Sequence, residues 1–107
     1  MTMASADNLN IGEDYYALGL QVILLKRTYV FPWSQFLYAE GGDDEVRLSF
    51  YTHDVLIKGR NLNSLVANLA NHGIGKLQEP ARPERFLSEA GPFIREISVE
   101  KISRDKA

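Results

Sequence analysis

A chain of 107 residues, 45% of them hydrophobic and 24% charged, has room for one compact domain but not for a second core. The net charge of −2 and the pI of about 5.6 argue against a protein that coats nucleic acid regardless of sequence, because such a protein needs a basic excess. The absence of cysteine excludes disulfides, thiol nucleophiles and Cys-ligated metals.

The ends of the chain predict its domain organisation. Residues 1–12 are small and polar without a period, so we expect a disordered leader, followed by one domain over residues 13–102 and a frayed tail over residues 103–107. No stretch approaches the roughly 20 apolar residues of a membrane helix, and the N-terminus does not have the order of a signal peptide. We therefore expect a cytoplasmic protein with no membrane partner.

Alternation of apolar with polar or small residues predicts most of the strands. The six expected strands are Tyr15–Leu25, Trp33–Glu40, Glu45–Tyr51, Asp54–Lys58, Ile74–Gln78 and Phe93–Ile102. The alternation is most regular where Val46, Leu48 and Phe50 share one face. Two glycines and two aspartates at positions 41–44 predict a hairpin turn before that strand.

A single helix is predicted between Leu62 and His72. Apolar residues recur there at helical spacing, while the opposite face is polar. Asn61 stands at the expected N-cap, and Gly73 stands where a left-handed C-terminal cap would lie. Together these elements predict a strand-rich α+β fold: a small curved antiparallel sheet or barrel of five to six strands with the helix packed across one opening or face.

Candidate catalytic groups are weak. His53 beside Asp54 resembles a base with an orienting carboxylate, but adjacent residues of a strand point to opposite faces. The acidic run Asp43 to Glu45 does not have the spacing of a calcium loop. We predict no catalytic residue, no metal and no cofactor. A small enzyme that uses His53 is kept as a remote alternative.

A mixture of cations and aromatic residues follows the first predicted strand. Lys26 and Arg27 precede Tyr29, Phe31 and Trp33, an arrangement that can hold single-stranded RNA through phosphate pairing and base stacking. The same residues are also typical of a core with a solubilised turn, or of a protein interface. The sequence leaves these three interpretations open.

The string Ile57-Lys58-Gly59-Arg60-Asn61-Leu62-Asn63-Ser64-Leu65 resembles the second signature of Sm-like RNA-binding small barrels. The resemblance implies that Lys58, Gly59 and, more loosely, Asn61 lie near an RNA pocket. The first signature of that family is not evident, and the family places its helix before the strands. A pleckstrin-like sheet with one helix is an alternative fold.

The function predicted from these observations is a non-enzymatic binding or assembly module, with Sm-like RNA binding as the alternative. The main support for the assembly module is a short run of residues that is apolar on both faces of its strand, so that the fold or a partner must cover both faces. The run consists of Val22, Ile23, Leu24 and Leu25. We expect it to form the interface of a homo-oligomer.

Overall fold

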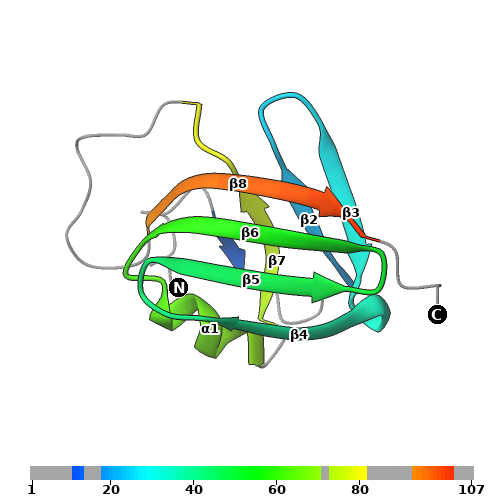
Figure 1. Cartoon of the computed structure of the whole chain (residues 1–107), viewed down its shortest axis with the longest axis horizontal. Helices are drawn as coiled ribbons and strands as arrows, with labels where there is room; N and C mark the ends of the chain where they lie inside the picture. Colours follow the sequence, from blue (N-terminus) through cyan, green and yellow to red (C-terminus); the bar gives the residue numbers. More distant parts are fainter. Residues whose placement is uncertain (1–10, 14–17, 71–72, 82–92, 103–107) are drawn as a thin grey trace.

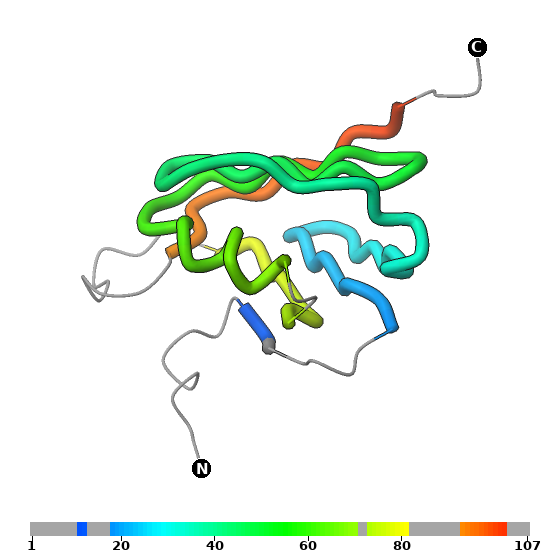
Figure 2. Tube along the Cα trace, turned by 90° about the horizontal axis from the view of Figure 1, so that it is seen from below, coloured from blue at the N-terminus to red at the C-terminus, as the bar shows by residue number. Residues whose placement is uncertain are grey.

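A computed structural model describes residues 11–13, 18–70, 73–81 and 93–102, which form two four-stranded sheets and a single α-helix. The predicted strand-rich α+β class is confirmed. The predicted number of strands is wrong, because the described residues form eight strands rather than five or six, and these eight do not close into a barrel. The described residues pack as two layers, and the helix lies at the level of one layer, against one end of the other (Figure 2).

Sheet A contains strands from both halves of the chain, and sheet B is a meander extended by the last strand (Figure 1). In spatial order, sheet A contains β1 (Ile11–Glu13), β7 (Ile74–Gln78), β2 (Gly19–Ile23) and β3 (Thr28–Pro32). Sheet B contains β4 (Phe36–Gly41), β5 (Glu45–Phe50), β6 (His53–Arg60) and β8 (Phe93–Lys101). Among the strands that the structure describes, only β2 and β7 pair in parallel.

The core lies between the inner faces of the two sheets. Val46, Leu48 and Phe50 of β5 are completely buried, as their alternation predicts, while Leu20 and Val22 of β2 face them from sheet A. Burying apolar side chains from both layers is the main source of stability in such a two-sheet arrangement.

The helix, α1 (Asn63–Ala70), begins one residue later than predicted, and residues 71 and 72, where its end was predicted, lie outside the described part of the chain. Leu65 and Leu69 are buried, so the predicted apolar face is confirmed. The predicted N-cap is wrong: the carbonyl oxygen of Leu62 accepts the first helical hydrogen bond, from Val66. Asn61 instead adopts a left-handed φ of 56°, which asparagine tolerates better than most residues.

The predicted strand Trp33–Glu40 begins too early, because its first three residues form a turn and only the rest is a strand. Pro32 ends β3, Trp33–Gln35 forms a 3-10 turn, and β4 begins in the other sheet at Phe36. Proline has no N–H for a central ladder, so its place at the end of an edge strand follows from its chemistry. This turn carries the chain from sheet A to sheet B.

Two other boundaries differ from expectation. Of the predicted strand Tyr15–Leu25, β2 retains only Gly19–Ile23, and residues 14–17 are outside the described part of the chain. Ile11 is buried in β1, although the sequence analysis assigned it to the leader. The hairpin at positions 41–44 is confirmed, because β4 and β5 pair antiparallel across it.

Candidate interaction surface

Lys58 lies on the exposed face of sheet B between two carboxylates. Its cross-strand neighbours are Glu45 on β5 and Glu96 on β8. Direct cross-strand neighbours have Cβ atoms about 5 Å apart, close enough for the negative charges to lower the potential around the ammonium group. This surrounding is unfavourable for phosphate binding.

Gly59 has a steric role that the sequence did not indicate. It is buried at a β-bulge, where a Cβ would overlap the carbonyl oxygen of Phe93 on β8. Only glycine lets the two backbones approach this closely. Asn61 is exposed beyond the end of β6, so of the residues implied by the Sm-like resemblance, Lys58 and Asn61 reach the surface.

Tyr29 belongs to an aromatic cluster that joins the two sheets. Its ring stacks on Phe31, with centroids 5.5 Å apart, and Phe31 stacks on Phe50 of sheet B at 4.6 Å. The guanidinium group of Arg27 lies 6.0 Å from the centroid of the Tyr29 ring. Trp33 is also buried, so these aromatic residues are mainly core.

The two groups of predicted RNA-binding residues are not brought together. Lys26 and Arg27 lie in the turn between β2 and β3, whereas Lys58 lies near the end of β6 that leads to α1. Figure 1 shows this turn at the top of the view and the β6–α1 connection at the lower left. A single RNA site that includes both groups has no geometric support.

His53 contacts the same aromatic cluster. Its ring lies 5.6 Å from the Tyr29 centroid and 5.3 Å from that of Phe31, and Nδ1 forms a 2.7 Å hydrogen bond with Oγ1 of Thr52. Burial, and then the charge of Lys101, lower the pKa of His53. Asp54 does not orient His53: its carboxylate accepts hydrogen bonds from Ser49 and Arg47 on the opposite face of the strand.

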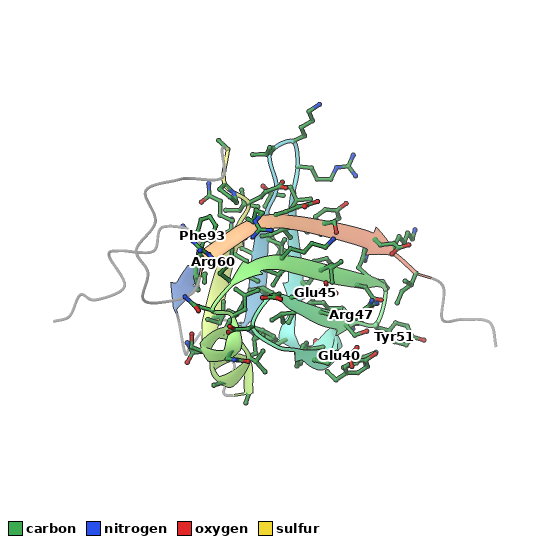
Figure 3. The ribbon with its side chains drawn as sticks, turned by 60° about the vertical axis from the view of Figure 1, so that its left-hand side comes forward. Glu40, Glu45, Arg47, Tyr51, Arg60 and Phe93 are labelled. Carbon is green, nitrogen blue, oxygen red and sulfur yellow. The ribbon has the colours of Figure 1, made fainter. Side chains whose placement is uncertain are left out.

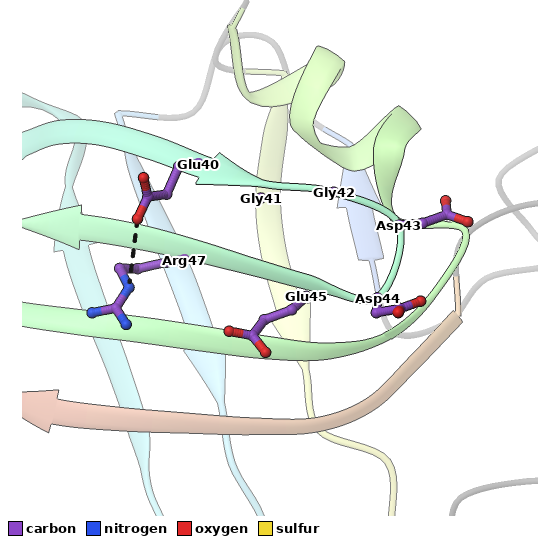
Figure 4. A pocket seen from close by; sticks show the side chains of 7 residues that line it. All are labelled: Glu40, Gly41, Gly42, Asp43, Asp44, Glu45 and Arg47. Atoms are coloured by element: carbon purple, nitrogen blue, oxygen red, sulfur yellow. Dashed lines mark ion pairs between the residues drawn. The ribbon is translucent and has the colours of Figure 1, made fainter.

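A shallow hollow lies beside the hairpin between β4 and β5 (Figure 4). It is lined by Glu40, Gly41, Gly42, Asp43, Asp44, Glu45 and Arg47. Asp43 and Asp44 point away from Arg47 at the tip, and Arg47 lies 4.0 Å from Glu40 and 3.2 Å from Asp54. Within the described ranges, no group of three or more His, Asp or Glu side chains could hold a metal ion.

The hairpin tip has a structural role. Its Asp43 carbonyl accepts from the Leu62 N–H at 3.0 Å, and its Asp44 carbonyl accepts from the Gly59 N–H at 2.9 Å. The Asn63 amide also donates to the Asp43 carboxylate at 3.1 Å. These bonds tie the tip to the start of α1.

The predicted interface run is divided between core and surface. Val22 is completely buried, Ile23 and Leu24 are half-buried, and Leu25 is exposed. The sheet therefore covers one face of the run, and Leu25 is the member most available to a partner.

Exposed apolar residues gather around the rim of sheet A that β3 forms. Val30, in the middle of β3, is 68% exposed, and Leu18, just before β2, is 89% exposed. The strands expected from the sequence end at Leu25 and resume at Trp33, so Val30 was not expected in a strand. The available signal was the sequence Thr28 to Pro32, in which Tyr29 and Phe31 alternate with Val30.

Sheet B carries two further groups of side chains that reach the surface, one at each end. Leu37, Tyr38 and Tyr51 form one group of exposed apolar side chains. At the other end the Arg60 guanidinium lies 5.7 Å from the Phe93 ring centroid. Figure 3 shows the pair Arg60 and Phe93 far from Tyr51 along this sheet.

No family model, curated protein or solved structure matches this chain. Across the part that the structure describes, no helix has the length and apolar character needed to cross a membrane.

Proposed function

We propose that this protein is a non-enzymatic assembly module that binds a second copy of itself through the β3 rim of sheet A. The observation that carries the proposal is the open edge of β3 with the exposed Val30 at its centre. An unpaired edge strand is a template for pairing with another chain unless it is blocked.

The other edges are less accessible. Strand β1 has only three residues, and α1 contacts β4. The Ile97 N–H of β8 donates to a carboxylate oxygen of Glu79 at 3.5 Å. Among the described edge strands, β3 is the one in which a strongly exposed apolar residue stands at the centre of the strand and no contact with the helix or with Glu79 is given for the outer edge.

The mass of the protein in solution tests this proposal. Multi-angle light scattering at tens of micromolar should give twice the chain mass of 12.1 kDa. Val30→Lys should shift the mass to that of the monomer while the circular dichroism spectrum shows that the fold is retained, since this side chain is solvent-exposed in the single chain. Gln21→Lys is the matched control, because Gln21 is also exposed and lies directly across from Val30 but in an inner strand.

A monomeric wild-type protein at this concentration would contradict the proposal. An equal effect of the two lysine variants would also contradict it, because the edge would then have no special role.

Sm-like RNA binding has less support. Two carboxylates flank Lys58, and Gly59 is explained by its contact with β8. Tight binding of short RNA that falls steeply with salt and is abolished by Lys58→Ala, with stability unchanged, would favour the RNA-binding alternative instead.

A further inference from the structure

We infer that two copies of the chain pair β3 with β3 in an antiparallel register centred on Val30, which joins the two A sheets into one continuous sheet. This inference rests on the proposed function and adds the pairing register to it.

The direction of the backbone groups of β3 follows from its pairing with β2. Hydrogen bonds from Leu24 N–H to the Arg27 carbonyl and from Trp33 N–H to the Leu18 carbonyl lie at the two ends of this ladder. Because hydrogen-bonded and non-hydrogen-bonded pairs alternate in an antiparallel ladder, Tyr29 and Phe31 direct their backbone groups toward β2. Thr28, Val30 and Pro32 therefore direct theirs outward.

These three outward residues complement a second copy of themselves. With Val30 facing Val30 across a twofold axis, each Val30 N–H donates to the Val30 carbonyl of the other copy. Thr28 then faces Pro32, which has a carbonyl to accept the Thr28 N–H and has no N–H of its own. Pairing related by a twofold axis is the commonest form of self-association.

Side chains favour this register over a shifted one. Val30 is the exposed large apolar residue of β3, and centring the pair on it places two valine side chains next to each other. A shift by one step of the ladder would place Val30 beside Thr28 and move Pro32 beyond the end of the facing strand. The register centred on Val30 uses all five residues of β3.

Charge also favours the antiparallel direction. Lys26 and Arg27 lie in the turn just before β3. Antiparallel pairing places the cationic turns of the two copies at opposite ends of the joined strands, whereas parallel pairing would bring them together. Like charges next to each other destabilise strand pairing.

Single cysteines test the register, because the natural chain has none. In Val30→Cys the two sulfur-bearing residues would face each other with Cα atoms about 5.5 Å apart, within the range of a disulfide. In Thr28→Cys the two cysteines would be about 14 Å apart along the strand direction, which is too far. Mild oxidation should therefore crosslink Val30→Cys at least about tenfold faster than Thr28→Cys.

Mixing Thr28→Cys with Pro32→Cys provides the second measurement. These positions face each other in the proposed register, so oxidation of the mixture should give the mixed dimer as the main product in mass spectrometry of the intact proteins. Circular dichroism of each reduced variant checks that it is folded.

The outcomes separate the register from the proposed function. A dimer by light scattering that crosslinks best when Thr28→Cys is mixed with Val30→Cys would overturn the register and retain self-association through β3. A dimer that does not crosslink at any of the three positions would overturn the use of β3. A monomer would overturn both.

Discussion

Strands β3 and β8 both lie at the rim of a four-stranded sheet, but their outer backbone groups differ in what they contact. At β8, the outward Ile97 N–H donates to Oε2 of Glu79 at 3.5 Å. Oε1 of the same carboxylate accepts from the Leu25 N–H at 3.2 Å, so Glu79 bridges the two sheets. At β3, the outward groups of Val30 have no such partner in the described chain.

The difference shows how one β-sandwich can satisfy an outer backbone group at the edge of one sheet and leave those at the edge of the other sheet free to pair with another chain. Glu79 follows β7 directly, and its own N–H donates to the Ile23 carbonyl at 2.8 Å, which continues the parallel ladder. The carboxylate is therefore held by sheet A while it covers an edge of sheet B. A covered edge cannot accept a strand from another molecule.

The largest effect is expected from a change that separates β8 from β6. Gly59→Ala would place a methyl group against the backbone of Phe93 and Ile94, where no flexible side chain can move aside. We expect a loss of about 3 kcal/mol or more in the free energy of unfolding, measured by urea titration. Gly42→Ala is the matched control, because no atom lies within 4 Å of its Cβ position.

This comparison also tests the Sm-like interpretation of Gly59. If Gly59→Ala were as stable as Gly42→Ala, the close approach of β6 and β8 would be wrong, and a role in ligand binding would regain support.

A smaller effect is expected from opening the closed rim. Glu79→Gln keeps the size of the side chain but replaces one of its two acceptor oxygens by an amide nitrogen. A single oxygen then remains to accept hydrogen bonds from the Leu25 and Ile97 N–H groups. Because both bonds are long, we expect a loss of about 1 kcal/mol in urea titration. Hydrogen exchange at the Ile97 amide should accelerate more than exchange at the amide of Leu48, which is buried in the inner strand β5.

The control for this change is Glu100→Gln, which removes an exposed carboxylate from β8. Equal exchange rates at Ile97 in the wild type and in Glu79→Gln would mean that the carboxylate does not protect this edge.

Local features of the fold were predictable from the sequence. The alternation in β5, the hairpin at positions 41–44 and the buried leucines of α1 each depend on residues close together in the chain. The division into two sheets was not predicted, because it depends on which strands pair. The pairing of β2 with β7 joins residues that are distant in the sequence.

The candidate surface was harder to predict for the same reason. Glu79 and Leu25 are 54 positions apart, so nothing local indicates that one covers the other. The residues around Gly59 in the sequence fit a ligand-binding loop as well as a close contact between two strands. Only the position of the Phe93 backbone shows that the glycine is needed for the strand contact. The importance of Val30 for strand pairing depends on the position of β3 at the edge of its sheet, which the local sequence does not indicate.

The smallest effect concerns His53, which joins sheet B to the aromatic residues of β3. Burial and the charge of Lys101 lower its pKa in the folded state below the ordinary value of 6.5. The unfolded chain therefore binds a proton more readily, so the contribution of neutral His53 is fully present above about pH 6.5 and is lost as the pH falls toward the folded-state pKa. We expect the free energy of unfolding to decrease modestly over this interval in urea titrations.

The groups facing His53 are Thr52, Lys101 and the rings of Tyr29 and Phe31, so the effect of Lys101 can be separated from burial. Lys101→Met should raise the pKa of His53, measured by NMR of the ring protons, while keeping it below the ordinary value because burial is the larger cause. His53→Gln should reduce the dependence of stability on pH in this interval, and the remaining dependence would come from the other titrating groups. An unchanged dependence in His53→Gln would show that protonation of His53 is not coupled to the packing of β3 against sheet B.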